Sequence, residues 1–142
     1  MLLFYLRHGD PIYDPDSLTP LGERQAEALA RRLSVYGLDE IYASSSRRAQ
    51  QTAQPCCELL HKSMTVLDWC NEGYAWSELG VKTETGAHTW GFLHEPTKQI
   101  MASEQVFRLG HEWYTHPAFP PSFESGIKRI EREADAFLLS LG

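Results

Sequence analysis

Apolar and polar positions in the first third of the chain predict a strand followed by a helix. The apolar run 2–6 stops at Arg7 and is followed by Gly9 and Pro11, which is typical of a strand buried on both faces that ends in a turn. A single apolar stripe at helical spacing follows, formed by Ala26, Leu29, Ala30 and Leu33. We expect this helix to begin at Pro20, with Thr19 as its N-cap, and to end at Gly37.

The next segment repeats this order. Residues 39–43 read as a second strand, 44–46 as a turn, and Thr65–Leu67 as a third strand. A helix is predicted between them, from about Arg47 to His61, with a kink at Pro55. The order strand, helix, strand, helix, strand predicts a mostly parallel sheet with right-handed crossovers.

The segment 72–123 has a different character. It is rich in Gly, Trp, His and Pro, and only Gln99–Tyr114 has a helical pattern. We interpret residues 73–123 as a lid over the strand ends, within one domain that covers residues 1–142. Trp76 and Trp90 could line a substrate pocket there or simply pack locally.

A final amphipathic helix follows the lid, and Ser122 or Ser125 is expected to cap it. Its apolar face consists of Ile127, Ile130, Ala134, Phe137, Leu138 and Leu141. No strand follows this helix, although the preceding order calls for one. We therefore expect the chain to be a truncated piece of a longer domain.

Composition narrows the class of protein. The 142 residues are 42% hydrophobic and 23% charged, which fits one globular domain. A net charge of −6 argues against a general binder of nucleic acid or of anionic membranes, but two or three local cations could still hold a small anion. No apolar stretch approaches the roughly 18 residues of a membrane span, and the N-terminus lacks a leader pattern. We expect a cytoplasmic protein whose oligomeric state the sequence leaves open.

The cysteines do not suggest a disulfide framework or a structural zinc site. The chain has three, Cys56, Cys57 and Cys70, with no CxxC pair. We interpret all three as small core residues. The histidines outside the first turn also lack regular ligand spacing, so no metal site is expected.

Candidate chemistry gathers at the predicted carboxyl ends of the strands. Arg7 and His8 end the first strand, Arg48 lies just past the second, and Glu72 follows the third. Guanidinium groups bind phosphate oxygens as bidentate forks, and the amides at a helix N-terminus also suit an anion. A neutral imidazole could act as the nucleophile, and a carboxyl group could protonate a leaving oxygen. This set of residues suggests phosphoryl transfer through a phosphohistidine without a metal.

Four segments then make the chain resemble the histidine phosphatase superfamily, also called phosphoglycerate mutase-like. They are Leu6–Gly9, Leu18–Ala26, Ser44–Ala53 and Asn71–Glu72, which lie in the family's order and spacing. The resemblance implies an α/β fold with a mostly parallel sheet, helices on both faces and a missing C-terminal part. It also implies that no metal or organic cofactor is needed.

The same resemblance implies a role for each matching residue. His8 is the nucleophile that becomes phosphorylated, and Glu72 is the general acid. Arg7 and Arg48 bind the phosphoryl group, and Gly9 and Ser44 complete the phosphate site. Ser44 could instead only cap the following helix, and Arg47 is interpreted as a solvated side chain.

Two departures from the family pattern leave alternatives open. The family carries a second catalytic histidine after a later strand, and no such strand or histidine follows here. Mutases of the family carry Asn seven residues after Arg7, where this chain has Asp14. We therefore predict a phosphomonoester hydrolase acting on a small phosphorylated substrate. The alternatives are a phosphoglycerate-type mutase or a non-catalytic phospho-ligand-binding module, and the 142 residues alone are expected to show little turnover.

Overall fold

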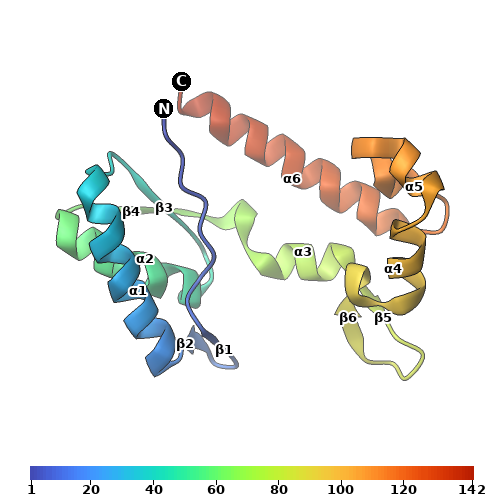
Figure 1. Cartoon of the computed structure of the whole chain (residues 1–142), viewed down its shortest axis with the longest axis horizontal. Coiled ribbons are helices and arrows are strands. Elements are labelled where there is room, and N and C mark those ends of the chain that lie inside the picture. Colours follow the sequence, from blue (N-terminus) through green and yellow to red (C-terminus); the bar gives the residue numbers. More distant parts are fainter. The chain divides into compact units, whose positions relative to one another are not determined.

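The computed structural model describes residues 1–142 and divides into two compact units, residues 1–71 and 72–142 (Figure 1). Each unit combines helices with short strands, so the mixed α/β class predicted from the sequence is confirmed. None of the helices combines the length and the apolar character that crossing a membrane requires.

The first unit contains a hairpin, a parallel strand pair and two long helices. Its elements are β1 (Pro11–Tyr13), β2 (Asp16–Leu18), α1 (Pro20–Leu33), β3 (Ile41–Ser44), α2 (Arg47–Leu60) and β4 (Met64–Leu67). β1 and β2 are antiparallel, whereas β3 and β4 are parallel, with Ile41 opposite Met64 and Ser44 opposite Leu67. The predicted second and third strands are therefore present and paired as expected.

The start of α1 follows the sequence prediction, whereas the α-helix ends at Leu33, before the predicted end at Gly37. The Thr19 hydroxyl accepts a hydrogen bond from the amide of Gly22, and Pro20 occupies the first turn, where its missing N–H costs nothing. A short 3₁₀ turn then ends at Gly37, whose φ of 60° suits a residue without a side chain.

The strand predicted over residues 2–6 is not formed. Residues 1–8 pair with no strand, and Leu2 and Tyr5 are 70% and 96% exposed. An extended segment is buried on both faces only when strands pair with its edges and other elements cover it. Here only Phe4 packs inward, with its ring 5.0 Å from that of Tyr36. The parallel sheet of this unit therefore has two strands rather than three.

The core of the first unit lies where α1 and α2 pack together. It consists of Ala30, Leu33, Ile41, Cys56 and Cys57. Burial raises the pKa of both cysteine thiols, so they stay protonated at neutral pH. The core assignment of these two cysteines is correct. That of Cys70 is wrong, because this residue lies in an exposed turn after β4.

The second unit is more helical than its sequence suggested. Its elements are α3 (Glu72–Leu79), β5 (Gly80–Lys82), β6 (His88–Trp90), α4 (Glu95–Met101), α5 (Glu104–Leu109) and α6 (Pro121–Ser140). β5 and β6 form an antiparallel hairpin. The core of this unit consists of Val106, Tyr114, Phe119 and Phe123. Trp76 and Trp90 are half-buried against each other, with ring centroids 4.8 Å apart.

The last helix begins earlier than its predicted caps. α6 starts at Pro121, with Pro120 as its N-cap residue, so neither Ser122 nor Ser125 caps it. Proline fits a first turn because the amides there have no partner within the helix. Ser125 instead donates a hydrogen bond from its hydroxyl to the Ser122 carbonyl, one turn back.

Candidate active site

His8 lies in the turn between the N-terminal segment and β1, and its ring is oriented by its own backbone. The ring Nδ1 lies 2.7 Å from the carbonyl oxygen of Gly9. A carbonyl oxygen can only accept, so Nδ1 carries the proton in this bond. The lone pair of the neutral ring is then on Nε2, which is the atom available for attack on an electrophile.

The turn after His8 is held by Gln25 of α1 and by Thr19, the N-cap residue of that helix. The amide of Asp10 donates to Gln25 Oε1 at 2.7 Å, and the hydroxyl of Thr19 donates to Asp10 Oδ2 at 2.6 Å. Gly9 and Gly22 let the two backbones approach closely, since a Cβ built on Gly9 would lie 2.7 Å from the Gly22 carbonyl oxygen. The segment Leu18–Ala26 therefore fixes the turn that carries His8.

Arg48 lies in the first turn of α2 and is paired with Asp16. Its guanidinium donates to Asp16 Oδ1 at 2.7 Å, and its side chain is 10% exposed. Asp16 Oδ2 also accepts from the backbone amide of Arg47 at 2.6 Å. Partial burial tends to raise the Asp16 pKa, but the hydrogen bonds and the charge of Arg48 outweigh it, so that pKa lies below its usual range.

Two residues bring His8 and Arg48 together in the first unit. The ring of Tyr13 stands edge-on to the His8 ring at 6.5 Å, and the Arg48 guanidinium lies 5.1 Å from the Tyr13 ring centroid. The buried hydroxyl of Thr52 accepts from the Gly9 amide at 3.0 Å and donates to the Arg48 carbonyl at 2.7 Å. The nucleophile and the arginine predicted from sequence thus share a common support.

Ser44 shapes the turn before α2. Its hydroxyl accepts from the Ser46 amide at 3.2 Å and lies 3.2 Å from the Ser46 hydroxyl. The N-cap residue of α2 is Ser46, which makes no side-chain capping bond. Ser44 therefore organises the entry to the helix from a position two residues before the cap.

Arg7 belongs to the first unit, whereas Glu72 belongs to the second. Arg7 is exposed and precedes His8 directly. Glu72 is the first residue of the second unit and of α3, and it follows Asn71, whose side-chain amide donates to Ser45 Oγ at 2.7 Å. Their proposed roles come from their positions in the motifs.

The side chains that support the site were not among the residues predicted from the sequence. Four side chains accept hydrogen bonds from backbone amides between residues 9 and 18 or at the start of α2. They are Asp16, Gln25, Gln51 and Thr52. Three of them stand inside the matched motif segments, and Asp16 lies just before one of them. The position of a polar residue within such a segment was the signal that could have identified these supporting side chains.

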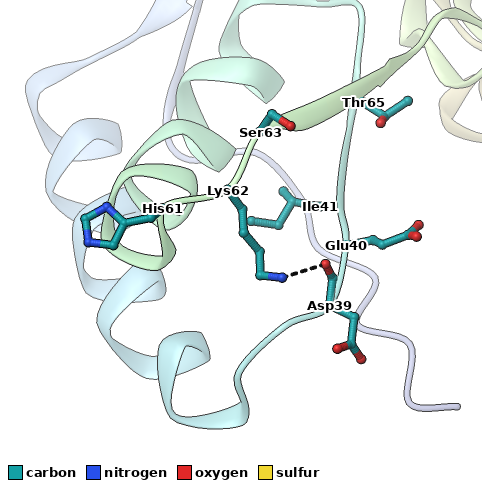
Figure 2. Close-up of a pocket in the computed structure, with 7 residues that line it drawn as sticks. All are labelled: Asp39, Glu40, Ile41, His61, Lys62, Ser63 and Thr65. Carbon is teal, nitrogen blue, oxygen red and sulfur yellow. Dashed lines mark hydrogen bonds between the residues drawn. The ribbon is translucent and has the colours of Figure 1, made fainter.

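The polar hollow in Figure 2 lies away from this site. It has a volume of about 400 Å³ and is lined by Asp39, Glu40, Ile41, His61, Lys62, Ser63 and Thr65. These residues stand at the amino ends of β3 and β4, whereas Ser44 is the last residue of β3 and Arg48 lies after the strand, in the first turn of α2. Lys62 donates to the Asp39 carbonyl at 2.8 Å. No group of three or more His, Cys, Asp or Glu side chains in residues 1–142 could hold a metal ion.

Comparison with known proteins gives three findings. Residues 3–100 match the profile of the histidine phosphatase superfamily, branch 1. A curated relative from Hydrogenobacter thermophilus, named "Putative phosphoserine phosphatase 2", is 27% identical over 146 residues. The alignment covers 96% of this chain but 64% of that relative. A solved structure named "Mycobacterial hydrolase 1" is 28% identical with a TM-score of 0.41, over 44% of this chain and 34% of its own.

Proposed function

The chain belongs to the histidine phosphatase superfamily, and on this basis we propose that it transfers the phosphoryl group of a small phosphomonoester to His8 and then to water. The observation that carries the proposal is the 2.7 Å bond from His8 Nδ1 to the Gly9 carbonyl. With the proton on Nδ1, the lone pair of the neutral ring is on Nε2, the atom proposed to attack, and the first turn of α2 supplies Arg48.

The first half of the proposed reaction uses four side chains. His8 Nε2 attacks phosphorus, so a P–N bond forms while the bond to the leaving oxygen breaks. Arg7 and Arg48 neutralise the charge on the non-bridging oxygens, which is the main requirement of phosphoryl transfer. Glu72, as a carboxylic acid, donates a proton to the leaving oxygen.

The second half reverses these roles. The Glu72 carboxylate accepts a proton from a water molecule, which attacks the phosphohistidine. The P–N bond breaks, the electron pair returns to Nε2, and inorganic phosphate leaves. His8 is then neutral again and Glu72 is protonated, so the cycle closes without a metal or an organic cofactor.

Trapping of the phosphoenzyme tests this proposal. The chain is incubated with phosphoserine, the substrate class that the relative's name suggests, and with p-nitrophenyl phosphate as a general probe. We expect mass spectrometry at alkaline pH to place one acid-labile phosphate on His8, and His8→Ala to carry none. His94→Ala is the matched control, since His94 lies at the start of α4. A chain that binds phosphate but never becomes phosphorylated would contradict the proposal and favour a binding module.

The product distinguishes a phosphatase from a mutase. We expect free inorganic phosphate as the phosphoenzyme decays, in keeping with Asp14 at the position where mutases carry Asn. This decay should be slow, because little turnover is predicted for the 142 residues alone. Transfer of label from His8 to an added phosphoglycerate, faster than its release to water, would favour the mutase instead.

A further inference from the structure

We propose that Thr52 is a positioning residue that couples the orientation of the His8 ring to the arginine-bearing turn of α2. This inference rests on the proposed function, because it assigns Thr52 a part in the same phosphoryl transfer. Thr52 lies in the second turn of α2, one turn after Arg48, and only 8% of its surface is exposed.

The Thr52 hydroxyl makes two hydrogen bonds, one as acceptor and one as donor. It accepts from the Gly9 amide at 3.0 Å and donates to the Arg48 carbonyl at 2.7 Å. The second bond is the ordinary one from a helical threonine to the residue four positions earlier. The first bond reaches across 43 positions in the sequence and has no part in the helix itself.

Gly9 is the residue through which Thr52 acts on His8. The Gly9 carbonyl accepts from His8 Nδ1, and the Gly9 amide donates to Thr52. Both groups flank the same α-carbon, so fixing the amide also limits where the carbonyl can point. Gly9 is itself buried, and without the hydroxyl its amide would lose its partner in a place that water does not easily reach.

Thr52 therefore links the atom that selects the His8 tautomer to the backbone of the arginine expected to bind phosphate. Small losses of alignment are costly for such a pair, because a displacement of about 1 Å can cost about 100-fold in rate. Thr52 acts on His8 only through Gly9. It therefore affects the alignment and the tautomer of the His8 ring and takes no direct part in the chemical step.

The test compares Thr52→Val, which keeps the shape but lacks the hydroxyl, with Thr52→Ser, which keeps the hydroxyl. In Thr52→Val we expect phosphorylation of His8 to slow by about 10- to 100-fold. We also expect nitrogen NMR of the His8 ring to show a larger share of the form protonated on Nε2. Thr52→Ser should stay within about threefold of the wild-type rate and keep its tautomer, since both hydrogen bonds remain possible.

Controls separate this role from a purely structural one. Thr65→Val makes the same substitution at an exposed position of β4, and it should leave both the rate and the tautomer unchanged. If Thr52→Val does not fold, the comparison of Thr52→Ala with Thr52→Ser isolates the hydroxyl in the same way. Thermal unfolding of each variant shows that the folded state is being measured.

The outcomes distinguish this inference from the proposed function. A hydroxyl-free variant with the wild-type tautomer and rate would overturn the inference while leaving phosphorylation of His8 intact. A Thr52→Ser variant as impaired as Thr52→Val would also overturn it. If no variant, wild type included, becomes phosphorylated, the proposed function fails, and the NMR comparison alone still decides whether Thr52 sets the His8 tautomer.

Discussion

At the scale of single residues, Asp16 holds the entry to α2 in place. Its two carboxylate oxygens accept from the Arg47 amide and the Arg48 guanidinium, so one side chain fixes both the first turn and the side chain expected to bind phosphate. A carboxylate is favoured at this place, because the amides at a helix N-terminus carry partial positive charge. The same pair keeps the Asp16 pKa low, which makes its contribution to stability depend on pH.

We predict that Asp16→Asn lowers the free energy of unfolding by about 1–3 kcal/mol at pH 7. A carboxyl group with a lowered pKa stabilises the folded state above its unfolded value of 3.8, and this contribution is lost as the pH falls further. The difference between the variant and the wild type should therefore shrink below pH 3.8. Denaturant titrations at pH 7 and pH 3 measure this difference, with Asp14→Asn, in the turn between β1 and β2, as the control. An equal difference at both pH values would contradict the ionic role of Asp16.

At the scale of elements, the sequence predicted what local rules determine. The cap at Thr19 and the apolar stripe of α1 follow from patterns within a few residues. The parallel pair β3 and β4 follows from the order strand, helix, strand. The apolar run 2–6 failed as a strand because pairing depends on partners elsewhere in the chain, which composition does not reveal. In the same way the motifs predicted His8 and Arg48, but not the hydrogen bonds through Thr52 that connect them.

The contact of α1 with the His8 turn predicts that a Gly→Ala substitution in this helix lowers stability instead of raising it. Gly→Ala inside a helix normally stabilises it by about 1 kcal/mol. At Gly22 the added methyl group would collide with the backbone of Asp10, so we expect Gly22→Ala to destabilise by about 1–3 kcal/mol. Chemical denaturation measures the free energy of unfolding. The control Arg24→Ala, on the exposed face of α1, should change it by less than about 0.5 kcal/mol. A stabilised Gly22→Ala variant would mean that the turn can move away from α1.

At the scale of the whole molecule, the proposed reaction needs residues from both units. His8 and Arg48 belong to residues 1–71, whereas Glu72 opens residues 72–142. Asn71, the last residue of the first unit, donates a hydrogen bond from its side-chain amide to Ser45 Oγ. An acid that acts only on the leaving oxygen has a specific kinetic signature, because its loss matters only where that oxygen must be protonated.

We predict that Glu72→Gln separates substrates by their leaving groups. Phosphorylation of His8 by phosphoserine should slow by about 10²- to 10⁴-fold, because its alkoxide must be protonated as it leaves. With p-nitrophenyl phosphate the loss should stay below about tenfold, since nitrophenolate leaves without a proton and general-acid help adds little. Glu84→Gln, in the exposed turn between β5 and β6, is the matched control and should slow neither reaction. Rapid-quench measurements of phosphoenzyme formation give both rates. If Glu72→Gln slowed phosphorylation equally with the two substrates, Glu72 would not be the general acid and would contribute only to binding.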